Sequence, residues 1–500
     1  MTQGILPLFV VIPLASAFLN SLIGKKIKGF SDAISAVATF SLAFISVYAV
    51  FLFKENGALV YKVGGWIPPI GIAMVMDGLT VFMLVTINII AFLISVYSID
   101  YMNKYTEKPI FYCLFLLMIA GMNGVIISGD MFNLYVFLEI AAIASYSLVA
   151  FGTEHEELEA SFKYAVMGSL ASTFILLGIA FLYSFTSTLN MADMSIELLK
   201  KGPSHIVLLV SVLFLMGFGL KSALVPFHAW LPDAHPSAPA PISAMLSGVL
   251  IKSLGVYALI RIFFSVLGAS QQILSIFMIL GTLSIIIGAL LALGQWDFKR
   301  LLAYSSINQI GYVMLGIGLG TPLGILGGLF HLLNHSVFKS LLFLNSGAVE
   351  YSTGTRDLQK MGGLREKMPV TANTSLVASM SIAGVPPFNG FWSKLIIIVA
   401  CVQAQHFVHA FWAVFASILT LAYFMKVQRY AFFGELKGAF SHVKECPFFM
   451  KFSMIVLAVI CLAGGLLLLP SISGYLLDIA KDTVLAGQKD YIATVFGAIR

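Results

Sequence analysis

A small set of ionisable residues lies in stretches of this chain that are otherwise apolar. They are Glu139, Lys221, Lys252, His331, His335, Lys339 and Lys394, with Lys163 near the end of a similar stretch. A lysine or a glutamate costs roughly 2.5–3.5 kcal/mol at the centre of a membrane-spanning helix, so a membrane protein seldom keeps several without using them. Carboxylates, amines and imidazoles also take up and release protons. These residue types therefore predict proton transfer inside a membrane.

Glu139 and Lys221 are the predicted ion pair of this set. Both fall at similar depth in their stretches, and an opposed pair lets both groups stay charged where an isolated buried group favours its neutral form. A proton that moves near one partner then changes the balance of the other. A static structural ion pair is the alternative interpretation.

A second group of proton-carrying residues is regularly spaced in "HLLNHSVFKS". His331, His335 and Lys339 follow one another at intervals of four, which places them along one face of a helix. Histidine titrates near neutral pH, as a proton relay requires. A metal site on the two histidines, or a haem held by His228 and His235, would be the competing uses. No Asp, Glu or Cys lies close in sequence to complete a metal site, so we predict neither metal nor cofactor.

Proline interrupts two of the apolar stretches, in "GLKSALVPFHAWLPDAH" (219–235) and "VPPFNGFW" (385–392). The four predicted helix-breaking residues are Pro226, Pro232, Pro386 and Pro387. Proline removes a backbone donor, and a broken helix survives in lipid only where neighbours or water satisfy the freed groups. The breaks therefore predict an interior pathway.

Three residues at the first break are candidates for gating proton intake: His228, Asp233 and His235. Asp233 and His235 would equally suit the capping of a turn. Asp77, at the start of the third apolar stretch, is interpreted as interfacial rather than mechanistic. Four residues of "LLAYSSINQIGY" (301–312) suit interhelical hydrogen bonds as well as proton transfer: Tyr304, Ser305, Ser306 and Asn308.

The composition places the whole chain in a membrane. Of its 500 residues 59% are hydrophobic and 10% are charged, whereas a soluble domain is about 25% charged. The net charge of +6 does not indicate nucleic-acid binding, because the basic residues are scattered through short loops. The four cysteines form no CxxC motif, and no GxxxxGK[ST] phosphate-binding loop is present.

Fourteen stretches approach the roughly 20 apolar residues that a span needs. They are 4–23, 31–53, 76–98, 110–128, 131–151, 162–187, 205–230, 240–265, 271–294, 301–319, 323–348, 371–400, 406–430 and 452–472, of which the seventh and twelfth are broken. An even number places both termini on one side. Lysine and arginine concentrate in the connections after spans 1, 3, 9, 11 and 13, which predicts that both termini are external in the cell membrane. Lys200 and Lys201 are the main exception.

The broken segments also indicate an internal repeat. The offset between their similar motifs nearly equals the offset between Asp130 and Asp297, which stand at the starts of spans 5 and 10. Spans 4–8 and 9–13 are therefore predicted to be two copies of one five-span unit, inverted because five is odd. The predicted divisions are 1–109, 110–265, 266–430 and 431–500. Lys221 and Lys394 are expected at corresponding positions, with Lys252, His335 and His331 between them.

Four runs of the sequence resemble one known family. They are "GDMFNLYVFLEIAAIASYSLVA", "LKSALVPFHAWLPDAHPSAPAPISAMLSGVLIKSLGVY", "DFKRLLAYSSINQIGY" and "HLLNHSVFKSLLFLNSGA". These runs are similar to the antiporter-like subunits of respiratory complex I and, most closely, to the D subunits of Mrp-type cation/proton antiporters. Membrane-bound hydrogenases carry near relatives. The resemblance covers about residues 70–430.

The resemblance implies an all-helical fold of fourteen spans with two inverted five-helix repeats. It implies that Glu139 is the family's span-5 glutamate, Lys221 its lysine partner and Lys252 the central lysine of span 8. His331 and His335 match the histidines of span 11, and Lys394 matches the terminal lysine of span 12. The implied partners are other membrane subunits of an Mrp-type antiporter or a complex I-related or hydrogenase complex. The implied cargo is the proton, with the sodium ion as a second candidate.

Two other functions remain open from the sequence. One is an electron-carrying or quinone-site membrane subunit of a respiratory complex, and the other is a stand-alone solute permease. The run of charges across successive spans fits ions better than an organic solute. The preferred prediction is a proton- or cation-translocating subunit with no catalytic site of its own, within a translocase or oxidoreductase complex.

Overall fold

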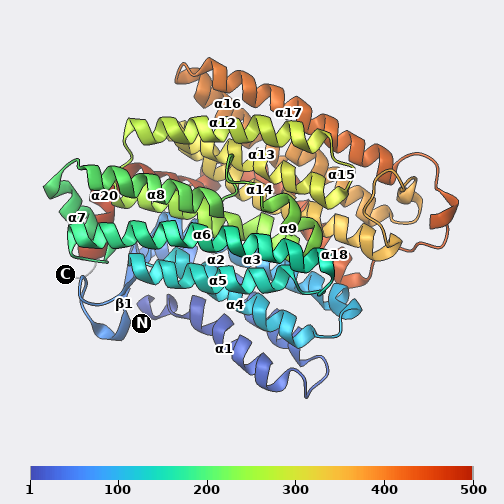
Figure 1. The fold of residues 1–500 in the computed structure, drawn as a ribbon, viewed down its shortest axis with the longest axis horizontal. Helices are drawn as coiled ribbons and strands as arrows, with labels where there is room; N and C mark the ends of the chain where they lie inside the picture. The colour runs from blue at the N-terminus through green and yellow to red at the C-terminus, as the bar shows by residue number, and fades with distance from the viewer. Residues whose placement is uncertain (1, 498–500) are drawn as a thin grey trace.

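A computed structural model describes residues 2–497, which fold almost wholly into helices that run side by side (Figure 1). The first five long helices are α1 (Leu8–Ile23), α2 (Phe30–Asn56), α3 (Gly78–Tyr101), α4 (Lys108–Ile127) and α5 (Met131–Val149). They are followed by α6 (His155–Thr186), α7 (Met191–Lys201), α8 (His205–Lys221), α9 (Leu231–Ser237), α10 (Ala240–Met245) and α11 (Ala258–Ile260). The remaining helices are α12 (Gln271–Leu293), α13 (Phe298–Gly318), α14 (Pro322–Thr353), α15 (Pro369–Ala383), α16 (Asn389–Gln403), α17 (Phe407–Val427), α18 (Phe448–Ala463), α19 (Pro470–Ser473) and α20 (Leu477–Gly497).

Two short strands form the one sheet found in residues 2–497. β1 (Leu59–Lys62) pairs antiparallel with β2 (Ala73–Met76), so that Leu59 faces Met76. This hairpin lies at the same end of the bundle as both ends of the chain, α7 and α20 (Figure 1). We call this end the terminal end. The other end, which carries the connections 24–29, 150–154, 354–368 and 433–447, is called the loop end.

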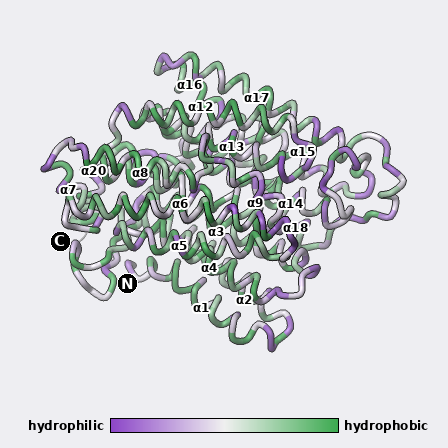
Figure 2. Tube along the Cα trace, viewed as in Figure 1, coloured by the Kyte–Doolittle hydropathy of each residue, from purple (hydrophilic) through white to green (hydrophobic). Residues whose placement is uncertain are grey.

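Within the described residues, ten helices are long and apolar enough to cross a membrane. Two shorter apolar helices, α8 and α16, flank the breaks expected in spans 7 and 12. Hydrophobic residues colour the helices along most of their length, and hydrophilic residues gather in the connections (Figure 2). The expectation of a multi-pass membrane protein is confirmed.

The helices that carry most of the ionisable residues lie at the centre of the bundle. The span 240–266 is wholly buried in its most apolar window and α3 is 89% buried in its own, whereas α2 and α17 are only 33% buried. Between Gly324 and Val349 nearly every residue of α14 is buried. Protein, rather than lipid, therefore surrounds Lys252 and the histidines of α14.

The span 240–266 is not a regular α-helix. Three π-helical segments, Leu246–Leu250, Lys252–Tyr257 and Arg261–Val266, occupy most of it. A π-helix has wider turns than an α-helix and occurs mostly as short pieces, often at functional sites. Lys252 begins the second of the three segments.

Backbone hydrogen bonds recur at a constant offset in the two halves of the chain. Met131 donates to the carbonyl of Leu189, and Phe298 donates to the carbonyl of Arg356. The offset from Met131 to Phe298 equals the offset from Leu189 to Arg356, and it also relates Asp130 to Asp297. Each of these two aspartates caps the helix that follows through the amide three residues on. The same local structure thus begins spans 5 and 10, the second span of each predicted repeat.

A second pair of recurring bonds surrounds the two helix breaks. Leu224 donates to the carbonyl of Gly219 where α8 ends, and Val385 donates to the carbonyl of Met380 where α15 ends. In both bonds the acceptor stands five residues before the donor. One offset along the chain therefore relates Leu224 to Val385 and Gly219 to Met380. The chain leaves its helix in the same way at both breaks.

Candidate functional site

Glu139 and Lys221 lie in contact, as the sequence predicts. The Lys221 Nζ is 3.9 Å from the Glu139 Oε1, at the outer limit of an ion pair. Lys221 donates a hydrogen bond of 3.2 Å to the hydroxyl of Tyr146, and the hydroxyl of Ser172 donates to Glu139. Each charge therefore has a second partner in place, so neither depends on the other alone.

The two partners differ in exposure. The side chain of Lys221 is 5% exposed, whereas that of Glu139 is 26% exposed. Glu139 lies on the outer face of α5, where Val136 and Ile143, one turn before and after it, are also exposed. The carboxylate is therefore reachable from outside the bundle near the middle of a span.

Lys252 lies in the interior and has no acidic partner. It is 1% exposed, and its amine donates to the backbone carbonyls of Ser247 and Gly248, the latter at 2.7 Å. No carboxylate within residues 2–497 lies within 4.0 Å of it. A cavity of about 10 Å³, room for about one water, lies between Lys221 and Leu250, two residues before Lys252.

The π-helical turn that holds the Lys252 amine packs directly on α13 and α14. The hydroxyl of Ser247 is 2.7 Å from that of Ser306 on α13. Gly248 lies so close to α14 that an added Cβ would overlap the hydroxyl oxygen of Ser340. Ser340 follows Lys339, so the carbonyls that hold Lys252 lie beside the lysine of α14.

The histidines of α14 lie on one face, as their spacing predicts. The rings of His331 and His335 are nearly parallel, with centroids 6.5 Å apart. His331 is held on both sides, by the Ser393 hydroxyl at 2.9 Å from Nδ1 and the Gln309 side-chain oxygen at 3.1 Å from Nε2. Neither ring nitrogen of His335 has a hydrogen-bond partner in the described part of the chain. His335 is therefore the freer of the two rings.

Lys339 is as buried as the two histidines, with 0% of its surface exposed. Its amine has no hydrogen-bond partner among the described residues and lies 5.9 Å from the centre of the Phe343 ring. A buried amine without a partner is costly, so this position indicates a use beyond packing.

Lys394 lies on α16, directly after Ser393, whose hydroxyl contacts His331. Its amine donates to the Ile382 carbonyl at 2.8 Å and to the Ser417 hydroxyl at 3.0 Å, and lies 4.7 Å from the centre of the Tyr312 ring. The Tyr312 ring is 5.5 Å from that of His331. A cavity of about 250 Å³ opens beside the Lys394 side chain.

The expectation that Lys221 and Lys394 occupy corresponding positions is wrong. Lys221 ends the helix before the first break, whereas Lys394 lies in the helix after the second break. Leu224 at the first break corresponds to Val385 at the second, and the same offset makes Lys221 correspond to Ile382. The carbonyl of Ile382 accepts the hydrogen bond from Lys394. The two amines thus approach equivalent helix ends from opposite sides of their breaks.

The prolines fall at the breaks with one exception. Pro226 lies between α8 and α9, and Pro386 and Pro387 lie between α15 and α16. Pro232 instead lies in the first turn of α9. A proline there starts a helix, because the amide that it lacks has no partner within the helix. Its interpretation as a helix break is corrected.

The gating candidates lie between the loop end and the interior. His228 is half-buried in the break, and Asp233 is 3.3 Å from the amine of Lys163 and 3.4 Å from the guanidinium of Arg300. His235 is fully buried, and its ring lies 4.7 Å from that of Phe343, which the Lys339 amine also faces.

Asp233 lines a charged cavity of about 330 Å³ at the loop end. Across it, Arg356 contacts Asp297 at 2.6 Å and donates to the Pro236 carbonyl at 2.7 Å. Burial opposes the charge of Arg356, but Asp297 and Glu350 outweigh burial and raise the pKa of the guanidinium. Lys163, on the rim, is 49% exposed and pairs with Glu159 as well as with Asp233.

Asp77, which the sequence places at the start of a span, is buried and paired. It is 4% exposed and receives two hydrogen bonds, of 2.6 and 2.7 Å, from the guanidinium of Arg261. Arg261, which is 1% exposed, was not among the predicted residues. The signal was present, because an arginine stands in an apolar run nine residues after Lys252.

Several neutral partners also escaped the sequence-based prediction. They are Tyr146 and Ser172 beside the Glu139–Lys221 pair, and Gln309, Tyr312 and Ser393 around His331. Gln309 stands next to Asn308 in a run already noted for its polar groups, and Ser393 precedes Lys394. A polar residue directly beside a predicted residue in the sequence was therefore a usable signal.

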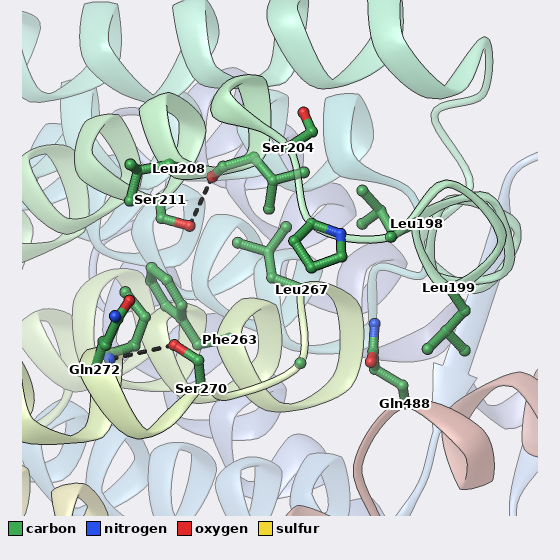
Figure 3. Close-up of a pocket in the computed structure, with 15 residues that line it drawn as sticks. Leu198, Leu199, Ser204, Leu208, Ser211, Phe263, Leu267, Ser270, Gln272 and Gln488 are labelled. Carbon is green, nitrogen blue, oxygen red and sulfur yellow. Dashed lines mark hydrogen bonds between the residues drawn. The ribbon is translucent and has the colours of Figure 1, made fainter.

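A larger cavity, of about 590 Å³, lies away from these residues. It is at the terminal end, between the first turns of α8 and α12, where Phe263, Leu267 and Gln488 contribute to its wall (Figure 3). None of the predicted site residues lines it. Cavity size therefore does not locate the functional site of this chain.

Comparison with known protein families gives two matches. The model of the transmembrane region of NADH:quinone oxidoreductase and Mrp antiporters matches residues 128–420. The model of the N-terminus of complex I chain 5 matches residues 66–112. All the ionisable residues described above, except Asp77, lie in the first of these regions.

Similar proteins and structures extend these matches over most of the chain. The D subunit of the Na+/H+ antiporter of Alkalihalophilus pseudofirmus is 34% identical over 86% of this chain and 87% of its own length. The N subunit of the NADH-quinone oxidoreductase of Desulforudis audaxviator is 37% identical over 88% of each. In the Mrp complex of a Dietzia species, one chain has a TM-score of 0.90 at 28% identity, over 99% of this chain and 100% of that one. A chain of an archaeal membrane-bound sulfane sulfur reductase matches with the same TM-score and coverage at 30% identity.

Proposed function

This chain belongs to the family of membrane subunits shared by NADH:quinone oxidoreductase and Mrp antiporters, and we propose that it moves protons along a chain of buried side chains. We call this chain the proton path: it comprises Glu139, Lys221, Lys252, Lys339, His335, His331 and Lys394. The observation that carries the proposal is the burial of Lys252, Lys339 and Lys394 with no carboxylate partner among residues 2–497. Such amines are costly when charged, so a membrane protein seldom keeps several without using them.

The proposed architecture is fourteen spans with two inverted five-helix repeats, spans 4–8 and 9–13. The hydrogen bonds that recur from Met131 to Phe298 and from Leu224 to Val385 support the repeat. The position of both ends of the chain at one end of the bundle supports an even number of spans (Figure 1). We further propose that the loop end faces the cytoplasm, because its connections hold most of the lysine and arginine, and that both termini are external.

Proton movement along the path follows from the charges of its members. A proton held by Lys252 repels positive charge on both sides, which weakens the hold of Glu139 on Lys221 and favours proton release from Lys394. The contacts through Ser340 on one side, and through Tyr312 and Ser393 on the other, support continuity between these groups.

The loop-end cavity is the proposed site of proton intake. Asp233, on its wall, lies two residues before the buried His235, and both His235 and Lys339 face Phe343. This arrangement supports a route from the charged cavity through α9 to α14. His228, in the break itself, is a further candidate for gating this route.

The energy for transport comes from outside this chain in our proposal. One charge that crosses a potential of 100 mV requires about 2.3 kcal/mol, and the sequence holds no nucleotide-binding motif to supply it. We propose that other membrane subunits, as in an Mrp-type antiporter or a complex I-related complex, act on Glu139. Its 26% exposure at mid-span supports a neighbouring subunit rather than lipid at this face. Sodium ions are the proposed counter-ion.

The test replaces one buried lysine in the assembled complex. Lys252→Met keeps the length of the side chain and removes its charge, so proton translocation in vesicles should fall at least about 100-fold. Lys426→Met is the matched control, because Lys426 also donates to two backbone carbonyls, those of Leu293 and Gln295, but lies away from the path at the end of α17. It should leave translocation unchanged.

Normal translocation by Lys252→Met would overturn the proposed path. An absorption spectrum with haem or cluster bands in the purified chain would favour an electron-carrying subunit instead. Solute uptake by the chain expressed alone would favour a stand-alone permease.

A further inference from the structure

The ion pair of Asp77 and Arg261 has no place in the proton path, yet it is more completely enclosed than the pair of Glu139 and Lys221. Besides its two bonds to Asp77, the guanidinium donates to the hydroxyls of Tyr257 at 3.1 Å, Thr80 at 3.2 Å and Ser265 at 3.4 Å. All three of its nitrogens are therefore engaged. A fork of this kind fixes orientation as well as distance.

The C-terminal helix α20 closes over this pair. The ring of Tyr491 lies 5.1 Å from the centre of the Arg261 guanidinium, and the side chain of Gln488 donates to the carbonyl of Val266 at 2.6 Å. On the other side α20 packs so closely on α3 that a Cβ added to Gly78 would lie 2.5 Å from the carbonyl oxygen of Ile479. Three elements, α3, α20 and the span 240–266, are thus joined at the terminal end.

The opposite flank of the same span is poorly filled. Phe263 and Leu267 face the cavity of about 590 Å³ between α8 and α12, and Gln488 closes one side of it (Figure 3). Close packing normally holds a buried helix in place, and at this end it is incomplete on one side. The polar contacts of Arg261 therefore add a directional restraint to the packing at this end of the span.

Lys252 lies nine residues before Arg261 on this span, and the turns between them are largely π-helical. Wide turns with poorer hydrogen-bond geometry allow a helix to change its register or rotation. We infer that Asp77 and Arg261 are positioning residues for Lys252: they anchor the terminal end of the span, so that Lys252 stays directed at α14. This inference rests on the proposed role of Lys252 in proton transfer.

Several titratable side chains surround Lys252, and loss of the anchor would change its distance from them. His235, on α9, and His331, His335 and Lys339, on α14, interact electrostatically with it. Lys221, at the end of α8, is a further cation on a helix that packs against the span. A rotated span would change the distance of Lys252 from all of them, and so the pH dependence of translocation.

The experiment compares two variants in the assembled complex, reconstituted into phospholipid vesicles. Arg261→Lys keeps the charge and loses the fork, and Asp77→Asn keeps the shape and loses the charge. Both should lower the maximal rate of proton translocation several-fold per assembled complex and shift the pH at which the rate is half-maximal. Asp32→Asn is the matched control, because Asp32 holds Lys108 at 3.0 Å between α2 and α4. It should leave the pH profile unchanged.

Hydrogen exchange gives an independent readout. Exchange in residues 246–266 should be at least about tenfold faster in Arg261→Lys than in the parent, with α14 unchanged. If Arg261→Lys fails to assemble, Tyr491→Ala removes only the contact from α20 and should shift the pH profile in the same direction.

An unchanged pH profile in assembled Arg261→Lys or Tyr491→Ala would overturn the inference and leave the pair a purely structural one. Loss of assembly with a normal rate and profile per complex would do the same. These results are distinguishable from failure of the proposed path, which the Lys252→Met variant tests on its own.

Discussion

Two ion pairs inside this bundle are built in opposite ways. Glu139 and Lys221 are joined by one contact of 3.9 Å, and the carboxylate is partly exposed. Asp77 and Arg261 are joined by two hydrogen bonds of 2.6 and 2.7 Å, and both residues are buried. The first pair has alternative partners in Ser172 and Tyr146, whereas the guanidinium of the second already uses all its nitrogens.

The difference distinguishes a pair suited to exchanging its partners, Glu139 and Lys221, from a pair suited to holding helices in place, Asp77 and Arg261. A lysine can release its proton in a buried site, whereas arginine keeps its charge in proteins. A long single contact is also weaker than a bidentate one, so it can be exchanged when a nearby charge changes. Residue type and geometry agree at both places, which supports the proposed movement of Glu139 and Lys221 and the proposed anchoring by Asp77 and Arg261.

The strongest test of this comparison is Glu139→Gln. Proton translocation should fall at least about 100-fold, because glutamine has the shape of glutamate but cannot titrate. Assembly and thermal stability should change little, since the carboxylate is partly exposed and Ser172 can still bond to the amide. Proton uptake by vesicles that contain the assembled complex measures the first, and the thermal midpoint measures the second.

Glu197→Gln is the control for this variant. Glu197 is also paired with a lysine, Lys200 at 2.8 Å, but lies on α7 at the terminal end. Near-normal translocation by Glu139→Gln would contradict the switching role and make its ion pair a structural one.

The second test gives the Glu139–Lys221 pair the bidentate geometry of the Asp77–Arg261 pair. Lys221→Arg keeps the positive charge and adds a fork that can hold Glu139 with two bonds. Translocation should fall about tenfold or more, because the new side chain does not release a proton. If the pair were static, the arginine would serve as well as the lysine and the rate would stay near normal.

The smallest expected effect comes from Ser172, whose hydroxyl competes with Lys221 for Glu139. Ser172→Ala removes a hydrogen bond to a charged group, which is worth about 1.5–3 kcal/mol when fully buried and less at a partly exposed carboxylate. The rate of translocation should change several-fold. Thr173→Val is the control, since Thr173 stands next to Ser172 but donates to the carbonyl of Ser169 on its own helix, and it should not alter the rate. Equal effects of the two variants would contradict a role for the Ser172 hydroxyl in the exchange of partners at Glu139.

Much of the fold followed from the sequence because a membrane limits what a chain can do. A span needs about 20 apolar residues, and a break needs proline and polar neighbours. Both breaks lie where proline predicted them, and the family resemblance drawn from four runs is confirmed by the matches over residues 128–420. Among the described residues, ten of the spans meet the criteria for a membrane helix outright. Helix α20 was not predicted, because Gly487 interrupts its 21 residues and several charged side chains make the stretch too polar for a span.

The candidate site was predictable in its charged members and less so in their partners. Glu139 was assigned to Lys221 correctly, because both lie at a similar depth in neighbouring spans. The partner of Asp77 was missed, since its position at the start of α3 gives no sign that Arg261 would reach it or that α20 would cover the pair. The role of each residue in proton transfer stays a prediction until the variants are measured.

The sequence by itself determined which stretches are apolar enough to cross a membrane, where two of them break and which charges they carry, because hydropathy and proline act locally along the chain. Only the tertiary structure decided which charges meet. Arg261 reaches Asp77 from a distant part of the chain, and His331 is held by Gln309 and Ser393 from two other helices. Lys394 reaches the helix end equivalent to that of Lys221 from the other side of its break. Such contacts depend on the rotation and depth of packed helices, which spacing along one helix does not specify.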